Sequence, residues 1–185
     1  MTNNEVIKTV CRLANRQDVL DYIDGKTDCS EETVKTFKTL TELVNLVVSE
    51  LASSYIPMRK SEDATSSFNR VYYSALSEDL LKIISVKDMQ GKEIDYVYSP
   101  EFITVGSSKV NIEYEYMPKP KKENEELGYS QKDLSTLTLA YGVLAEFAIV
   151  NGDFEEAVMW HKRFEDKIYL ICAPKNKKIK TRSWV

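Results

Sequence analysis

Residues 134–168 read LSTLTLAYGVLAEFAIVNGDFEEAVMWHKRFEDKI, a stretch that predicts two helices joined by a short turn. Ser130 is the expected N-cap of the first helix, with Asp133 three residues on in the capping-box position. Asn151-Gly152 should end this helix, and Asp153 can cap the next. Helices joined by so short a turn must be antiparallel neighbours, so the stretch predicts a helical hairpin.

Each helix of the hairpin carries apolar residues at intervals of three and four, the spacing of one helix face. The first stripe consists of Leu134, Leu137, Tyr141, Leu144 and Ala148. The second consists of Phe154, Ala157, His161, Phe164, Ile168 and Ile171, before Pro174 terminates the helix.

His161 is the only histidine of the chain, and it falls inside the second stripe. Its position in an apolar stripe predicts a packed histidine with one satisfied ring nitrogen. Two alternatives remain: the general base of a hydrolytic triad, and an interface residue that is sensitive to pH because histidine titrates near neutrality.

The N-terminal part also predicts helices. Residues 4–24 indicate one or two short ones that end at Asp24-Gly25, and a longer helix should begin near Asp28 or Ser30. Pro57 cannot continue the long helix. Its stripe of Phe37, Leu40, Val44, Val47 and Leu51 is widened by Leu43, Leu46 and Val48. So wide a stripe indicates burial on more than one side, either inside the domain or against a neighbouring subunit.

Between these helices the period changes to two. VNIEYEY, residues 110–116, alternates apolar and polar residues and predicts a half-buried strand. Residues 80–86, 93–98 and 102–105 are further strand candidates, so we expect a small antiparallel sheet of about four strands. The region 55–78 is less regular. VYYSALSEDLL (71–81), which begins inside this region, fits either a helix or an extended strand.

The predicted fold class is therefore α+β: a bundle of N- and C-terminal helices with an inserted small antiparallel sheet. The expected organisation is bundle helices at 1–54, a β-rich insert at 55–117, a polar, solvated linker at 118–129, a helical hairpin at 130–173 and a basic arm at 174–185.

The composition argues against several classes of function. The net charge of −4 disfavours a general nucleic-acid binder, and no run of about 18 apolar residues predicts a membrane span. The N-terminus does not have the pattern of a secretory signal. The three cysteines lie far apart and suggest reduced thiols in a cytoplasmic setting, with Cys11 and Cys172 on helix faces.

Motifs for chemistry are missing from the sequence. No glycine-rich phosphate loop and no nucleophile elbow occur, and no cysteine–histidine cluster suggests zinc. We therefore expect a protein that is not an enzyme and that uses no cofactor or metal. Five of the eleven tyrosines lie between 96 and 129; cross-strand packing explains Tyr96, Tyr114 and Tyr116, and any exposed tyrosine would suit a protein interface.

A family resemblance covers roughly residues 80–172. A tyrosine-rich strand ends in proline at VNIEYEYMPKP, a polar linker follows, and the hairpin then matches the pattern A-E-(F/Y)-…-G-(D/E)-(F/Y)-E-x-A-x-x-W. This order resembles small head–tail connector proteins of tailed bacteriophages, of the adaptor or tail-tubular type. The matching residues are Ala145, Glu146, Phe147, Gly152, Asp153, Phe154, Glu155, Ala157 and Trp160.

The resemblance implies a structural subunit of a ring, commonly twelve-fold, that joins the portal to the tail. Its implied partners are further copies of itself, the portal protein and other tail or neck proteins, with DNA only as passing cargo and no membrane. Its implied location is the neck or tail of the virion, after assembly in the host cytoplasm. The alternative is a monomeric adaptor or regulatory module that binds one protein through the hairpin.

For subunit contacts we expect the helix around 34–51 and the hairpin to pack against neighbours. The basic tail, KNKKIKTR at 175–182, is either a solvated end or an arm that docks on an acidic partner or nucleic acid and becomes ordered there. The candidate interface residues are Phe37, Leu43, Leu46, Val48, Lys175, Lys177, Lys178, Lys180, Arg182 and Trp184.

Overall fold

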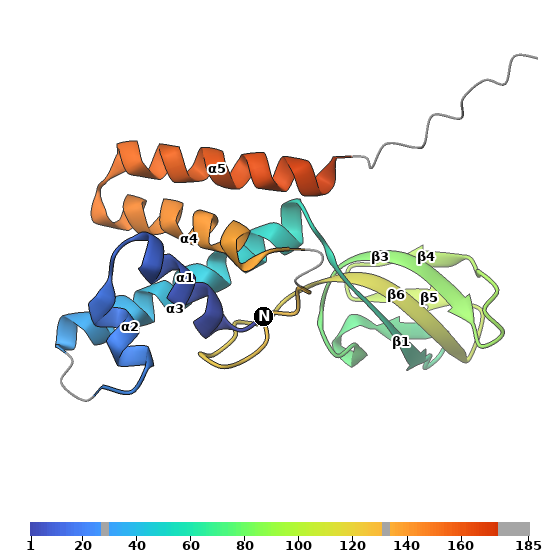
Figure 1. The fold of residues 1–185 in the computed structure, drawn as a ribbon. Helices are drawn as coiled ribbons and strands as arrows, with labels where there is room; N and C mark the ends of the chain where they lie inside the picture. Colours follow the sequence, from blue (N-terminus) through green and yellow to red (C-terminus); the bar gives the residue numbers. More distant parts are fainter. Residues whose placement is uncertain (27–29, 131–133, 174–185) are drawn as a thin grey trace, which may run out of the picture.

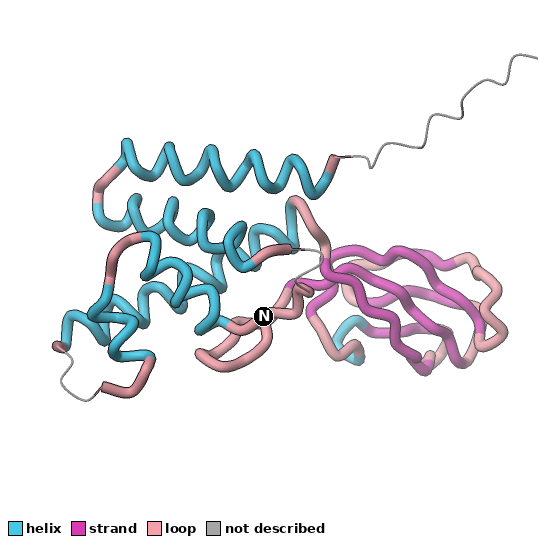
Figure 2. Tube along the Cα trace, viewed as in Figure 1, coloured by secondary structure: helices cyan, strands magenta, loops and turns pink. Residues whose placement is uncertain are grey.

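The computed structural model describes residues 1–26, 30–130 and 134–173. Within them the chain is α+β, with a helical part and a β part side by side (Figures 1 and 2). The five helices are α1 (Asn3–Leu13), α2 (Gln17–Ile23), α3 (Glu31–Ser54), α4 (Thr136–Asn151) and α5 (Phe154–Cys172). The six strands are β1 (Met58–Thr65), β2 (Arg70–Tyr72), β3 (Asp79–Asp88), β4 (Tyr96–Tyr98), β5 (Phe102–Val105) and β6 (Lys109–Met117).

The helices from both ends of the chain form one bundle, as predicted. Their shared core includes Val6 of α1, Leu40 of α3, Leu139 of α4 and Phe164 of α5, all of them buried. Figure 1 shows α4 between α5 and the N-terminal helices. The sequence therefore folds back to complete a bundle that the β part interrupts.

α4 is the central helix of the bundle. It packs against α1, α3 and α5, and its buried residues are distributed around the whole helix rather than along one stripe. At Gly142 the neighbouring helices come so close that an added Cβ would lie 2.9 Å from Cγ1 of Val47 and 3.1 Å from the Phe164 ring. This glycine is what allows α3, α4 and α5 to approach at that level.

Two helix starts show how local hydrogen bonds choose a boundary. Ser30 caps α3 by accepting a hydrogen bond from the Thr33 N–H (3.1 Å), as predicted. For α4 the predicted cap at Ser130 is wrong, because Ser135 accepts from the Thr138 N–H (3.1 Å) and the helix begins after it. Both serines can cap, so spacing alone could not choose between them; Asp133 lies outside the described residues.

At the start of α2 the carboxylate of Asp18 accepts three side-chain hydrogen bonds. Arg16 donates to it through Nε and Nη2 (2.9 and 2.8 Å), and the Thr33 hydroxyl donates to it from α3 (3.2 Å). These hydrogen bonds, with the Arg16 pair as the main cause, lower the pKa of Asp18 from 3.8 to about 2.

This pKa shift predicts a pH-dependent contribution to stability. Asp18 binds its proton more weakly in the folded chain, so its stabilisation is complete above pH 4 and is lost as the pH falls towards 2. Because the pair is partly exposed, we expect Asp18→Asn to lower the free energy of unfolding by less than about 1 kcal/mol at pH 6. Urea denaturation at pH 6 and pH 2.5 should show the difference shrinking at the lower pH; an equal difference at both would contradict the assignment.

The β part consists of two three-stranded antiparallel sheets, β1-β6-β3 and β2-β5-β4. They enclose a second core, made of Val71, Ile83, Val86, Ile103, Val105, Val110, Ile112 and Tyr114. The prediction of about four strands in one sheet is therefore too low. β1, MRKSEDAT, pairs with β6 over its whole length, but only Met58 of it is buried, so no apolar alternation marks it in the sequence.

The uncertain segment 71–81 is neither one helix nor one strand. It contains β2, a short 3-10 turn at Tyr73–Ala75 and the start of β3 at Asp79. The Tyr73 hydroxyl donates to the carbonyl oxygens of Ser99 (2.7 Å) and Phe102 (3.1 Å) and so fixes the turn against the second sheet.

The polar linker is exposed along most of its length, as expected for a solvated connection, but the helices hold it at several points. Asn45 of α3 accepts from the Lys121 N–H (2.8 Å) and donates to its carbonyl oxygen (3.0 Å). Leu127 is fully buried, and the Tyr129 hydroxyl donates to the Ile56 carbonyl oxygen just after α3 (2.7 Å). These contacts join the helical part to the β part.

Cys11 and Cys172 lie in helices, buried and exposed respectively, and both are free thiols. Burial raises the pKa of Cys11 to about 11. None of the helices within the described ranges combines the length and apolarity needed to cross a bilayer.

Candidate functional site

The outer side of the β2-β5-β4 sheet is aromatic. Pairing of Tyr72 with Phe102, and of Arg70 and Val97 with Thr104, places these five side chains on the side opposite the buried Val71, Ile103 and Val105. Tyr72 packs against Phe102 with ring centroids 5.5 Å apart, and the Arg70 guanidinium lies 4.7 Å above the Phe102 ring. We call Arg70, Tyr72, Val97, Phe102 and Thr104 the aromatic face.

The outer side of the other sheet is different. Arg59 pairs with Glu115 (3.1 Å), and Asn111 links Ser61 (2.7 Å) to Asp63 (2.8 Å) by hydrogen bonds. Such a ladder of satisfied polar groups is typical of a surface that stays in water. The aromatic face instead exposes tyrosine, valine and arginine side chains, and tyrosine and arginine are enriched in protein interfaces.

Phe68 stands at a turn beside the aromatic face. Phe68 and Asn69 have φ angles of 52° and 63° between paired Ser67 and Arg70, as a two-residue hairpin turn of type I′ requires. Asparagine tolerates this left-handed region, whereas a bulky residue there is a rare outlier. Phe68 is also 99% exposed, so no packing within the described residues compensates for the strain. A strained, fully exposed aromatic side chain favours a role in contacting another molecule.

We expect Phe68→Asn to raise the free energy of unfolding of the isolated chain by about 0.5–1 kcal/mol, because asparagine adopts a positive φ at lower cost. Urea denaturation measures the change. Phe68→Ala is the matched control: it removes the same ring but keeps the unfavourable φ, so it should change stability little. An equal gain in both variants would contradict strain at this turn.

A second exposed apolar surface lies where α4 meets α5. Ile149 and Val150 lie in the last turn of α4, and Phe154 begins α5; all three are large apolar side chains exposed to solvent. Asp153, Glu155 and Glu156 are also exposed there. We call these six residues the hairpin tip. It combines apolar side chains with three carboxylates and no cation.

The packed face of α5 differs from the predicted stripe. Ala157, Phe164 and Ile168 are buried as expected, but Trp160 is buried in place of His161, and Phe154 is exposed. Trp160 stacks on Tyr141 of α4 with centroids 5.6 Å apart, and its indole N–H donates to Glu156 (2.8 Å). The tryptophan buries the larger apolar surface, which shifts the packed face by one residue.

His161 is consequently not a packed core residue. Its side chain is 52% exposed and lies 3.5 Å from a carboxylate oxygen of Glu165, one turn along the same helix. Within the described residues His161 contacts no nucleophile. The fold therefore provides no residue that His161 could activate as a general base.

The predicted interface residues have three outcomes. Phe37, Leu43 and Val48 are buried in the core of their own chain, so the expectation that they face a partner is wrong. The apolar stripe of this helix is wide because other helices of the same chain surround it. Leu46 is 52% exposed and stays a candidate. The remaining six, Lys175, Lys177, Lys178, Lys180, Arg182 and Trp184, lie outside the described residues.

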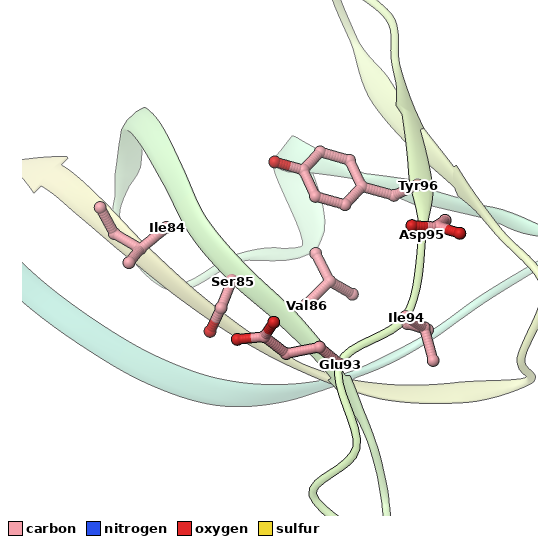
Figure 3. Close-up of a pocket in the computed structure, with 7 residues that line it drawn as sticks. All are labelled: Ile84, Ser85, Val86, Glu93, Ile94, Asp95 and Tyr96. Carbon is pink, nitrogen blue, oxygen red and sulfur yellow. The ribbon is translucent and has the colours of Figure 1, made fainter.

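The β part also has an open cavity of about 300 Å³ between β3 and the segment before β4 (Figure 3). Figure 3 shows the Glu93 carboxylate directed towards Ser85, whereas that of Asp95 lies apart, beside Tyr96. The two carboxylates do not converge, and the described part of the chain has no group of three or more residues arranged as metal ligands. The cavity therefore gives no specific chemistry.

No protein-family model matches the chain, and no curated protein matches it in sequence. The functional inference therefore depends on the surfaces. The sequence indicates that an exposed tyrosine would suit an interface, but no pattern in it distinguishes Tyr72 or Phe102. The pair Phe68-Asn69 between two extended segments was the available signal for the turn, since asparagine favours positive φ.

Proposed function

We propose that this chain is a structural subunit of a head–tail connector ring, which joins the portal to the tail in a tailed bacteriophage virion. The observation that carries the proposal is the exposure of large apolar and aromatic side chains on two separate surfaces, the aromatic face and the hairpin tip. Exposed apolar patches of this kind mark sites where other proteins bind.

The two surfaces differ in chemistry, which supports a cyclic assembly. The aromatic face carries Arg70 beside aromatic rings, whereas the hairpin tip carries three carboxylates beside aliphatic and aromatic side chains. A ring is built from heterologous contacts, in which one surface of a subunit meets a different surface of its neighbour or of the adjoining ring. The aromatic face and the hairpin tip also lie on different parts of the molecule: the first on the β part, the second at the turn between α4 and α5 (Figure 1).

The order of features in residues 80–172 supports the connector class, because it resembles connector proteins over the strand, the linker and the hairpin. The implied partners are further copies of the chain, the portal and the next neck or tail protein. In this proposal DNA passes through the ring, and the chain itself carries out no chemistry.

Tyr72→Ala tests the proposal through its aromatic face. We expect this change to raise the concentration needed for ring assembly on portal by about tenfold or more, as for a central aromatic residue of an interface. Tyr55→Ala is the matched control, because Tyr55 and Tyr72 are both 42% exposed but Tyr55 lies at the end of α3. Sedimentation of mixtures with purified portal measures assembly. Equal assembly of both variants and the wild type would remove the aromatic face from the proposed ring.

A further inference from the structure

The side of α5 that faces away from the bundle carries six residues, two single ones four positions apart and an adjacent pair at each end. Val158, Met159, Tyr169 and Leu170 are large apolar residues exposed by between 43% and 74%, and exposed Lys162 and Asp166 lie between them. At 100° per residue these six share a sector opposite Ala157, Trp160, Phe164 and Ile168, which pack towards α4. We call the six residues the outer face of α5.

No other described helix or strand covers this face. α4 is the element against which α5 packs, and Figure 1 shows α5 as the outermost layer of the bundle. Four large apolar side chains on one exposed helix face form a patch of the kind that marks a protein contact. What the patch binds can be argued from its charges.

Lys162 and Asp166 are one helical turn apart at the centre of the outer face. Neither has an ion pair within the part of the chain that the structure describes. In a second copy of α5 running in the opposite direction and centred at the level of Phe164, Lys162 lies opposite Asp166, and Asp166 opposite Lys162. Both charges are then neutralised by the partner.

The apolar residues follow the same symmetry. The same antiparallel alignment brings Val158 and Met159 to the level of Tyr169 and Leu170 of the second copy, and their positions around the helix place Val158 opposite Tyr169 and Met159 opposite Leu170. The central charges are therefore flanked on both sides by apolar pairs. A surface that complements itself under a two-fold rotation is what an isologous dimer contact requires. A parallel pair would instead bring Lys162 against Lys162 and Asp166 against Asp166.

We propose that two copies of this chain associate through the outer face of α5, antiparallel and related by a two-fold axis. The occupant of the face is a second copy because the face is complementary to itself in charge and in apolar pattern. This inference goes beyond the connector ring, since a two-fold contact neither requires nor produces a ring. It gives the chain a way to cover these four exposed apolar side chains of α5.

Charge reversal tests the alignment directly. Sedimentation velocity of the purified full chain over a range of concentrations should show a reversible monomer–dimer equilibrium. In a dimer of Lys162→Asp chains, all four side chains at positions 162 and 166 are carboxylates. In a dimer of Asp166→Lys chains, all four are ammonium groups. Each variant alone should raise the dimer dissociation constant by about tenfold or more, because like charges placed together at an interface are strongly unfavourable.

Complementation then separates this alignment from a general loss of association. An equimolar mixture of the Lys162→Asp and Asp166→Lys chains restores both pairs and should form a heterodimer, and the double variant should dimerise like the wild type. Lys167→Asp, exposed on the same helix but outside the outer face, is the matched control and should leave the dissociation constant unchanged. Circular dichroism confirms that every variant is folded.

Three results would overturn the two-fold contact. These are a wild-type chain that stays monomeric at all concentrations, single variants that associate like the wild type, and a mixture of the two single variants that stays monomeric. Ring assembly on portal is scored separately, by particles much larger than two chains. Loss of the dimer therefore does not remove the connector proposal, and loss of the ring does not remove the dimer.

Discussion

Trp160→Ala is expected to lower the free energy of unfolding by about 3–5 kcal/mol, the usual cost of deleting a large buried aromatic side chain. Trp160 forms the stacked ring contact between α5 and α4. It stacks on Tyr141, its indole N–H donates to Glu156 (2.8 Å), and the Arg163 guanidinium lies 4.8 Å from its ring. Alanine would leave a cavity between the two helices. Chemical denaturation of the purified variant measures the loss.

His161→Gln is the control for this result, because it changes the neighbouring residue on the exposed side of the same helix. Its side chain makes one contact of ion-pair type, with Glu165 at 3.5 Å, so the expected change is within about 0.5 kcal/mol. If His161→Gln lowered the free energy of unfolding more than Trp160→Ala, the packed face of α5 would be the stripe predicted from the sequence, with His161 buried in place of Trp160.

Gly142→Val is expected to lower the free energy of unfolding by about 1–3 kcal/mol, the range for overpacking a filled core. The first added carbon alone would lie 2.9 Å from Cγ1 of Val47 and 3.1 Å from the Phe164 ring. The two further methyl groups of valine increase the conflict, so α3 or α5 must move away from α4. Thermal and urea denaturation measure the effect.

Gly106→Val is the matched control, since an added Cβ there meets nothing within 4 Å. The same substitution should therefore change stability by no more than about 0.5 kcal/mol. A loss at Gly106 equal to the loss at Gly142 would show that the cost comes from removing glycine as such, and not from the close approach of three helices.

The helical hairpin could be predicted because its two helices have strong apolar periodicity and a turn marked by Asn151-Gly152. Gly152 does adopt the left-handed conformation that such a helix end needs, with a φ of 82°. The rotation of α5 about its own axis, which decides which of its residues are buried, could not be predicted from the spacing. Trp160 and His161 are adjacent, and both fit the spacing of a stripe that includes Phe164. The structure buries the tryptophan.

The β part could be predicted only where strands alternate. β6 shows the alternation clearly, and its Val110, Ile112 and Tyr114 are buried as predicted. β1 shows none, because its register with β6 is held by backbone pairing while most of its side chains stay at least partly in water. A strand of this kind is recognised by its partner strand and not by its own composition.

The candidate surfaces required the structure for a different reason. Exposure depends on which elements cover a residue, and Leu43 and Leu46 illustrate this, because both belong to the same predicted stripe but only Leu43 is buried. Likewise Tyr72 and Phe102 are 30 residues apart in the sequence, and strand pairing brings them into one face. Strand pairing of this kind could not be predicted from the single sequence.

Electron microscopy of the chain mixed with a portal protein encoded in the same genome tests the connector proposal most directly. We predict class averages in which a closed ring of this chain is stacked on the portal ring, and fewer such particles for Tyr72→Ala than for Tyr55→Ala. Bare portal rings at every concentration of the wild-type chain, with the chain remaining as monomers or dimers, would contradict it.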